Sequence, residues 1–265
     1  MSGSYGEITA YTRGIVAMTA PALSAGSTVA RHTVQVGGRM YTFCLVAPAE
    51  LSRRQIGEAL AGAVAELRAV DMAFSPYRQR SLVSAMRRGE LSARSYPPPL
   101  TDLVYRCAAL RLATDGWFDA WAGPAGFDPS GMLKGWAIDR AAVLLRAAGI
   151  DNYAITAGGD WLVRGTGPRG GPWKVGIADP DNPLRVLATV QLTDGAVATS
   201  GYGSPVLDPH TGEPVLGAGP AAVTGPALAT ADGYATALYA AGAAGLTWFD
   251  GSDGYRPVVL AGRPC

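Results

Sequence analysis

The sequence has little net charge and no long apolar run. Its 22 lysine and arginine residues are balanced by 21 aspartate and glutamate residues, for a formal net charge of +1. Without a broad positive field, the chain lacks the electrostatic attraction on which binding to nucleic acids and anionic membranes depends. No apolar run reaches the roughly 18 residues of a membrane span. We therefore expect a soluble protein whose partners are neither nucleic acids nor membranes.

Cysteine is also scarce, with Cys44, Cys107 and Cys265 as the three residues of this type. Their spacing fits no metal-binding motif. Reduced cysteines are the default expectation, and a disulfide between Cys44 and Cys107 stays open.

The N-terminal region lacks a convincing secretory signal. Residues 14–30 are small and apolar, but Glu7 precedes them, Arg13 is the only basic residue before them and Pro21 interrupts them. A signal peptide has a positively charged start and a continuous apolar centre. We expect a first strand and a turn here, in a cytoplasmic protein, with an exported location as the alternative.

The length and composition allow one large domain. Of the 265 residues, 48% are hydrophobic, so the chain can bury a substantial core. No internal repeat or low-complexity linker divides it, and we expect a single domain over residues 1–265. The 35 glycines and 19 prolines predict many tight turns.

The order of apolar patterns predicts an α+β fold in which helices and antiparallel strands are mixed. Residues 34–46 surround a Gly-Gly pair and predict a β-hairpin. In residues 51–72, apolar side chains recur every three or four positions, as in a helix packed on one face. Further helices are expected at 100–113 (after the prolines 97–99), at 136–148 (closed by Gly149) and at 231–241. Further strands are expected at 152–156, 161–164, 173–177, 186–192 and 257–260.

Residues 127–140 have the sequence FDPSGMLKGWAIDR, in which a glycine-rich turn leads into an expected helix with Lys134 at its mouth. A helix N-terminus offers unpaired backbone N–H groups and a partial positive charge, and a nearby ammonium adds a full charge. The segment predicts a site for an anionic phosphate ligand, although alone it is also compatible with plain architecture.

Several other short segments accompany the lysine segment. They are FSPYRQRS at 74–81, TDGWFD at 114–119, AGGD at 157–160, WKVGIADP at 173–180, TSG at 199–201, LDPHTG at 207–212 and ADGYATAL at 231–238. In this order and spacing the chain resembles the ApbE family, the FAD:protein FMN transferases, from about residue 60 to residue 260. The resemblance implies a single-domain fold related to T-folds, with FAD and one Mg²⁺ ion. It also implies transfer of FMN from FAD to a Thr or Ser hydroxyl of an acceptor flavoprotein, with release of AMP.

Asp232 and Thr236 form the candidate metal site. They are four residues apart in an expected helix, so the carboxylate and the hydroxyl lie on one face. Magnesium prefers such oxygen ligands and completes its shell with water and substrate phosphates. Without the resemblance, a capping carboxylate and an ordinary helical threonine are the better interpretation. The resemblance favours the metal site and implies the backbone carbonyl of Gly131 as a further ligand.

The resemblance also implies a flavin-binding site, in which Lys134 balances the charge of the diphosphate. Aromatic faces stack on flavin or adenine rings, and a carboxylate can accept hydrogen bonds from them. Without the resemblance, Tyr77 and Phe118 would be core aromatics. The Gly-Gly pair after residue 157 permits close backbone approach or a positive φ, and Asp160 either is functional or caps that turn. The cofactor-binding residues are thus expected to be Tyr77, Trp117, Phe118, Asp119, Lys134, Gly158, Gly159, Thr199 and Ser200.

The sequence departs from the family pattern at the catalytic histidine. Relatives have a Ser-His-Ile-Ile-Asp-Pro type of segment, whose histidine helps to remove the acceptor's proton, and Pro205 stands in its place here. Proline cannot accept a proton. His210 is the candidate base instead, because an imidazole, with a reference pKa of about 6.5, suits base catalysis at neutral pH. Asp208 belongs to the same loop, which closes the active site in the family.

Two further departures concern Arg87, which replaces an asparagine of the relatives, and an N-terminal Met-Gly-Thr segment that has no counterpart here. They leave two alternative functions open. One is an FAD-binding protein without transfer activity, such as a flavin carrier or a repurposed biosynthetic enzyme. The other is an FAD pyrophosphatase, in which water replaces the acceptor hydroxyl.

Overall fold

The computed structural model describes residues 28–180, 182, 184–201, 206–216, 219–251, 253–261 and 263–265. Residues 14–27 of the expected first strand and turn lie outside this part of the chain, and so does Pro205. None of the helices in the described part is long and apolar enough to cross a membrane.

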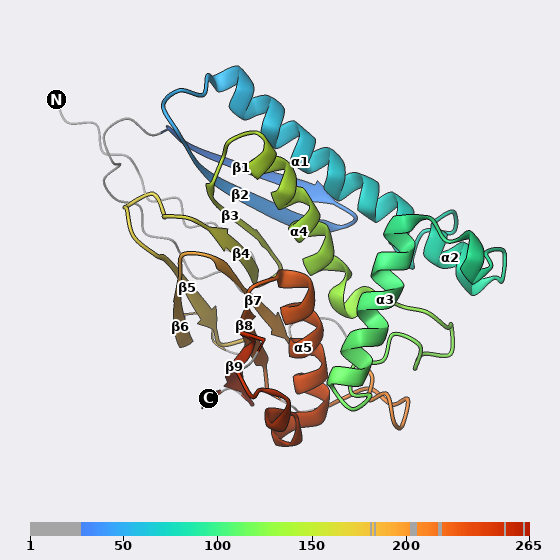
Figure 1. Cartoon of the computed structure of the whole chain (residues 1–265). Coiled ribbons are helices and arrows are strands. Elements are labelled where there is room, and N and C mark those ends of the chain that lie inside the picture. The colour runs from blue at the N-terminus through green and yellow to red at the C-terminus, as the bar shows by residue number, and fades with distance from the viewer. Residues whose placement is uncertain are drawn as a thin grey trace.

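An antiparallel sheet of eight strands runs through the molecule (Figure 1). In spatial order its strands are β1 (Thr28–Val36), β2 (Arg39–Ala47), β3 (Asn152–Ala157), β4 (Asp160–Arg164), β7 (Gly195–Ser200), β8 (Ala221–Gly225), β9 (Arg256–Leu260) and β10 (Arg263–Pro264). A separate pair, β5 (Trp173–Ala178) and β6 (Val186–Leu192), packs on one face of this sheet through a small core that includes Trp161 and Trp173.

The other face of the sheet is covered by helices (Figure 1). The helices are α1 (Arg53–Phe74), α2 (Leu82–Arg87), α3 (Pro98–Ala113), α4 (Ser130–Ala147) and α5 (Leu228–Ala241), with short 3₁₀ turns at Ala93–Ser95 and Gly242–Trp248. Helix α4 packs between α1 and α5, and α3 packs against α5. The main core lies between these helices and the sheet, and it buries large side chains such as Phe43, Leu67 and Ile155.

The α+β class and the mixture of helices with antiparallel strands are confirmed. The Gly37–Gly38 pair turns the β1–β2 hairpin, and both glycines have positive φ. At the end of α4, the N–H of Ile150 bonds to the carbonyl of Leu145 and that of Gly149 bonds to the carbonyl of Arg146. This is the Schellman arrangement, so Gly149 closes the helix as predicted.

Helix α4 begins at Ser130, six residues before the expected start. Two glycines within its first turns lower its intrinsic helix propensity, which explains the late predicted start. Tertiary contacts override that propensity, because Asp128 accepts a hydrogen bond from the N–H of Ser130 and Gly135 lies directly against the backbone of Leu228. Lys134 is therefore inside the helix rather than at its mouth.

Strands β7 and β8 and helix α2 were not expected from the sequence. The two strands, GAVATS and AAVTG, are buried along their whole length, so they show no alternation of polar and apolar residues. They are also rich in alanine and glycine, which favour strands little. Helix α2 has six residues, too few for a periodic signal, and starts where Ser81 caps the N–H of Ser84.

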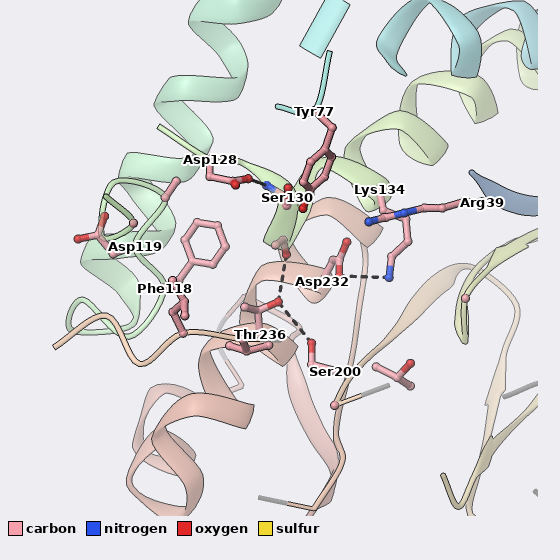
Figure 2. Close-up of a pocket in the computed structure, with 18 of the residues that line it drawn as sticks. Arg39, Tyr77, Phe118, Asp119, Asp128, Ser130, Lys134, Ser200, Asp232 and Thr236 are labelled. Atoms are coloured by element: carbon pink, nitrogen blue, oxygen red, sulfur yellow. Dashed lines mark hydrogen bonds and ion pairs between the residues drawn. The ribbon is translucent and has the colours of Figure 1, made fainter. Parts of the chain in front are cut away.

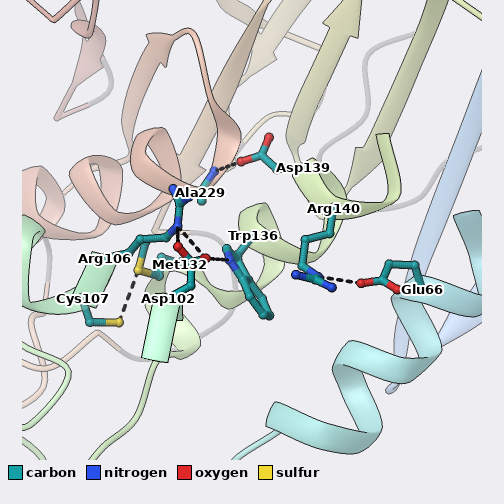
Figure 3. Close-up of polar contacts among 9 residues, drawn as sticks. All are labelled: Glu66, Asp102, Arg106, Cys107, Met132, Trp136, Asp139, Arg140 and Ala229. Carbon is teal, nitrogen blue, oxygen red and sulfur yellow. Dashed lines mark hydrogen bonds and ion pairs between the residues drawn. The ribbon is translucent and has the colours of Figure 1, made fainter. Parts of the chain in front are cut away.

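Helix α5 receives its N-terminal cap from a distant residue. Ala227, at the cap position, offers no side-chain acceptor. Asp139 of α4 supplies it, since its carboxylate accepts the N–H groups of Leu228 (3.1 Å) and Ala229 (2.8 Å) (Figure 3). This contact and the close approach at Gly135 fix α5 against α4.

The disulfide that the sequence left open does not form. Cys44 and Cys107 are both buried and free. Cys107 instead lies 3.3 Å from the sulfur of Met132 in the main core (Figure 3). The fold separates the two cysteines because Cys44 faces the core beneath β5 and β6, on the opposite side of the sheet.

Candidate functional site

A cavity of about 740 Å³ opens at the end of the sheet where the β1–β2 and β3–β4 turns meet the end of β7. Such a volume is typical of small-molecule binding sites, which span roughly 300–1,000 Å³. Eleven of the fourteen predicted site residues line it: Tyr77, Trp117, Phe118, Asp119, Gly131, Lys134, Gly158, Thr199, Ser200, Asp232 and Thr236. Gly159, Asp208 and His210 are not among the lining residues.

Lys134 of α4 and Asp232 of α5 line the cavity, and the buried Asp160 of β4 lies behind them, paired with Lys134. We call these three residues the inner wall. The ammonium of Lys134 lies 2.7 Å from Oδ2 of Asp160. It also lies 3.7 Å from Oδ1 of Asp232 (Figure 2). Asp160 is fully buried and also accepts the backbone N–H of Thr199 at 2.9 Å. Asp160 thus does more than cap its turn, because it holds Lys134.

The charges of the inner wall influence one another strongly. Burial raises the pKa of Asp232 to about 7; the nearby ammonium of Lys134 opposes this rise and the charge of Asp160 adds to it. Burial would lower the pKa of Lys134, but the two carboxylates outweigh it and raise the pKa above its usual value. The ammonium therefore stays charged and paired with these carboxylates. Its role in balancing phosphate charge stays a prediction.

Next to the inner wall, oxygen atoms from α4, α5 and β7 come together. The hydroxyl of Thr236 lies 3.2 Å from the carbonyl oxygen of Gly131 and 3.3 Å from the hydroxyl of Ser200. Asp232, one helical turn before Thr236, points toward the same region (Figure 2). The predicted triplet of Gly131, Asp232 and Thr236 is thus brought together by the packing of α4 on α5.

This set of donors suits a hard cation. A carbonyl, a carboxylate and a hydroxyl are the oxygen ligands that magnesium takes in proteins, usually with water and substrate phosphates. In the described part of the chain, no group of three or more histidine, cysteine or acidic residues could hold a metal ion. A cation beside Asp232 would favour the ionised form of this carboxylate.

Aromatic side chains also line the cavity. Tyr77 is 81% exposed, so it is a surface residue at the cavity and not the core aromatic of the alternative interpretation. Phe118 is 3% exposed and belongs to both the core and the cavity lining. Trp117 is partly buried and lines the cavity beside them. Exposed aromatic faces of this kind can stack on a planar ring.

Two of the predicted binding residues, Asp119 and Gly159, have roles in the local structure. The carboxylate of Asp119 accepts from Arg111 (2.8 Å) and from the N–H of Trp121 (2.8 Å), so its oxygens are already bonded. Gly159, with φ of +95°, forms the β3–β4 turn, and a Cβ there would lie 2.6 Å from the hydroxyl of Thr199. Gly158 shares the turn, with φ of +58°, and does line the cavity.

Asp208 and His210 lie at the rim of the cavity. Nδ1 of His210 is 3.4 Å from Oδ1 of Asp208, which also accepts the backbone N–H of His210. The imidazole packs edge-on against Trp117, with ring centroids 4.5 Å apart. Because Trp117, Leu207 and Pro209 line the cavity, the histidine borders it without being part of the lining.

Several lining residues were not predicted from the sequence, among them Arg39, Asp128, Ser130 and Thr156. The hydroxyl of Thr156 is buried and has no hydrogen-bond partner among the described residues, as expected where a ligand or water completes the site.

Arg87, which replaces the asparagine of the relatives, bonds to the carbonyl of Phe127 and the carboxylate of Asp128. It thereby fixes the entry to α4.

Comparison with known proteins adds to this geometry. The ApbE family model matches residues 124–258, just over half of the chain. The chain is 34% identical to the FAD:protein FMN transferase of Vibrio cholerae over 129 residues, which are 43% of this chain and 38% of that relative. It is 33% identical to the FAD:protein FMN transferase of Rhodobacter capsulatus over 158 residues, 55% of this chain and 28% of that relative. The matches span less than two fifths of the length of these relatives.

Solved structures share the fold. The ApbE protein of Thermotoga maritima superposes with a TM-score of 0.76 and 21% identity, covering 89% of this chain and 96% of its own. The flavin transferase ApbE of Vibrio cholerae gives a TM-score of 0.72 and 20% identity, covering 88% and 97%. With the family model matched across α4, the inner wall and α5, the chain belongs to the ApbE family.

Proposed function

We propose that this chain is a magnesium-dependent FAD:protein FMN transferase. The observation that carries the proposal is the placing of Gly131, Asp232 and Thr236 within one cavity that also exposes Tyr77 and Trp117. Oxygen ligands for a cation thus lie beside aromatic surfaces for a ring system. The names of the relatives in Vibrio cholerae and Rhodobacter capsulatus support the same activity.

The aromatic part of the cavity would bind the flavin. Tyr77 and Trp117 offer faces for stacking, and Phe118 closes the pocket from the core side. Gly158 carries no side chain at the β3–β4 turn, so ligand atoms can approach the backbone there. Thr199 and Ser200 end β7 in the same cavity and offer hydroxyl groups for hydrogen bonds.

Gly131, Asp232 and Thr236 would hold the magnesium ion. When bound there, the ion would stabilise negative charge on the phosphate oxygens of the substrate. Asp160 keeps the ammonium of Lys134 in place, and Lys134 in turn lies near Asp232 and keeps that carboxylate oriented. The N–H of Gly135, which bonds to the other oxygen of Asp232 at 3.2 Å, fixes the same carboxylate from α4.

In the transfer step, the Oγ of an acceptor Thr or Ser attacks the phosphorus of the FMN half of FAD. A phosphoester bond forms, the phosphoanhydride bond breaks, and AMP leaves. We place His210 as the base that takes the proton from the acceptor hydroxyl. The support is its position at the rim, where Trp117 packs against the imidazole and Asp208 lies within 3.4 Å of Nδ1.

The test is to incubate the protein with FAD, MgCl₂ and peptides that carry an Asp-x-x-Ser/Thr-Gly-Ala-Ser/Thr acceptor. A peptide heavier by one FMN less one water, together with AMP, supports the proposal, and EDTA should abolish both. Release of FMN and AMP without peptide labelling would instead identify an FAD pyrophosphatase. Bound FAD without turnover over several acceptors would identify a flavin carrier, and a protein that binds no FAD would contradict all three functions.

A further inference from the structure

The positive charge of Lys134 is already neutralised. Two carboxylates, of Asp160 and Asp232, lie within 4 Å of its ammonium, and the lysine side chain is only 13% exposed. Because the ammonium is paired with both carboxylates, it is not free to pair with a diphosphate. A dinucleotide in this cavity would therefore bind more strongly if another protein cation lay within reach, in addition to any cation held beside Asp232.

Arg39 is in a position to supply this cation. It is the first residue of β2, directly after the Gly37–Gly38 turn, and it is exposed. It lines the main cavity and also a smaller one of about 80 Å³ that contains Lys134 and Tyr77. Figure 2 shows its guanidinium beside Lys134, between the inner wall and Tyr77. Its charge is close enough to act on both Lys134 and Asp232.

The carboxylate next to the β1–β2 turn, that of Asp71, does not form an ion pair with Arg39. Asp71 of α1 lies against Gly37, where it could compete for the guanidinium. Oδ2 of Asp71 instead accepts two hydrogen bonds from Arg78, of which the one from Nε is 2.8 Å long. In the part of the chain that the structure describes, no carboxylate forms an ion pair with Arg39. Arg78 thus leaves Arg39 available to the cavity.

We infer that Arg39 binds the diphosphate of the dinucleotide substrate, while Lys134 positions the carboxylates of the inner wall. The inference rests on the proposed function only in taking a dinucleotide as the substrate. A guanidinium presents a planar fork of N–H donors that matches two phosphate oxygens, and it stays charged at any working pH. The short turn before β2 holds the base of this side chain at the cavity edge.

The test compares the binding of FAD, ADP and riboflavin to the wild-type protein and to Arg39→Met, Arg39→Lys and Arg31→Met. ADP carries the diphosphate without the flavin, and riboflavin carries the flavin ring without phosphate. Arg31 is the matched control, because it is an exposed arginine of the same hairpin that does not line the cavity. Affinities are measured by calorimetry with and without MgCl₂ at low and high KCl, and thermal melting checks that each variant folds.

Arg39→Met should bind FAD and ADP about ten- to a hundredfold more weakly, as for loss of a hydrogen bond to a charged group. Riboflavin affinity should change less than about twofold, Arg39→Lys should be intermediate, and Arg31→Met should match the wild type. The wild-type affinity for ADP should also fall more steeply with KCl than that of Arg39→Met. Equal losses for FAD and riboflavin, or no loss at all, would overturn the role of Arg39. A wild-type protein that binds no FAD would instead contradict the proposed function.

Discussion

The inner wall and the rim of the cavity each pair a carboxylate with a basic side chain, but they are built differently. The wall joins Asp160, Lys134 and Asp232 from three elements far apart in the sequence, and the lysine side chain is 13% exposed. The rim joins Asp208 and His210, two residues apart in one loop, and the histidine side chain is 51% exposed. Buried pairs are costly to break, whereas exposed pairs contribute little to stability. Changes in the wall should therefore affect both folding and catalysis, and changes in the rim only catalysis.

The largest expected effect is on catalysis and comes from the proposed metal ligands next to Lys134. Asp232→Asn and Thr236→Val keep the shapes of the side chains but remove a ligand charge and a hydroxyl. We expect Asp232→Asn to lower the rate of FMN transfer about a thousandfold, or ~4 kcal/mol, since an ion bound there would stabilise the transferred phosphoryl group.

Thr236→Ser is the control for Thr236→Val, because it restores the hydroxyl and should recover most of the rate. The rate is followed by mass spectrometry of an acceptor peptide at increasing MgCl₂ concentrations. A wild-type rate and an unchanged magnesium requirement for Asp232→Asn would show that the ion is bound elsewhere.

The next effect is on folding and tests the wall directly. Asp160→Asn leaves Lys134 buried with only the more distant Asp232 as its counter-charge. We expect the free energy of unfolding to fall by about 3 kcal/mol, the lower end for breaking a buried ion pair. Urea denaturation measures this change.

Asp151→Asn is the control for Asp160→Asn, because Asp151 makes an exposed ion pair with Arg146. This variant should lose less than about 0.5 kcal/mol. Similar losses in the two variants would mean that the wall is no more costly to break than a surface pair.

A smaller effect is expected at the rim. His210→Gln should lower the transfer rate up to about a hundredfold, the range of general base catalysis, with little change in FAD affinity or thermal stability. His32→Gln provides the control, because the only other histidine of the chain is exposed on β1 and does not line the cavity. If the two histidine variants transfer FMN equally fast, the proton leaves by another route.

The contrast between residues that are close in the sequence and residues that meet only in the fold also explains how much of the fold could be predicted. Helix α1 and the β1–β2 hairpin have local signals, a three-to-four-residue apolar period and a Gly-Gly turn, and both predictions are confirmed. Strands β7 and β8 have no local signal, because they are strands only through their neighbours in the sheet. The start of α4 was predicted too late for a related reason, since its contact with Leu228 is invisible in the local sequence.

Prediction of the site has the same limit. The spacing of Asp232 and Thr236 and the resemblance to a family identified residues that the structure does bring into one cavity. The partner of Lys134 could not be predicted, because Asp160 meets it only when β4 packs against α4. Arg39 carries no motif, and its place at the cavity depends on the register of the hairpin.

The smallest expected effect concerns a buried carboxylate that has backbone N–H groups instead of an ammonium as partners. Burial raises the pKa of Asp139, although the N–H groups of Ala229 and Leu228 and the charges of Arg164 and Arg106 oppose the rise. The folded protein therefore takes up a proton at a higher pH than the unfolded chain. Between this raised pKa and the unfolded value of about 3.9, the contribution of Asp139 to stability increases as the pH falls.

Asp139→Asn removes this titration and also weakens the cap of α5, which should cost about 1 kcal/mol at pH 7. The gap in unfolding free energy between the wild type and this variant should widen as the pH is lowered toward 4, as urea denaturation can measure.

Asp102 should show the opposite dependence of stability on pH, because its pKa is lowered instead of raised. Burial raises its pKa, but hydrogen bonds from Arg106 and Trp136 outweigh burial and lower it (Figure 3). The gap for Asp102→Asn should therefore shrink as the pH falls below about 4. If the difference in unfolding free energy from the wild type changes in the same direction with pH for both variants, then burial and hydrogen bonding do not shift the pKa values of Asp139 and Asp102 in opposite directions.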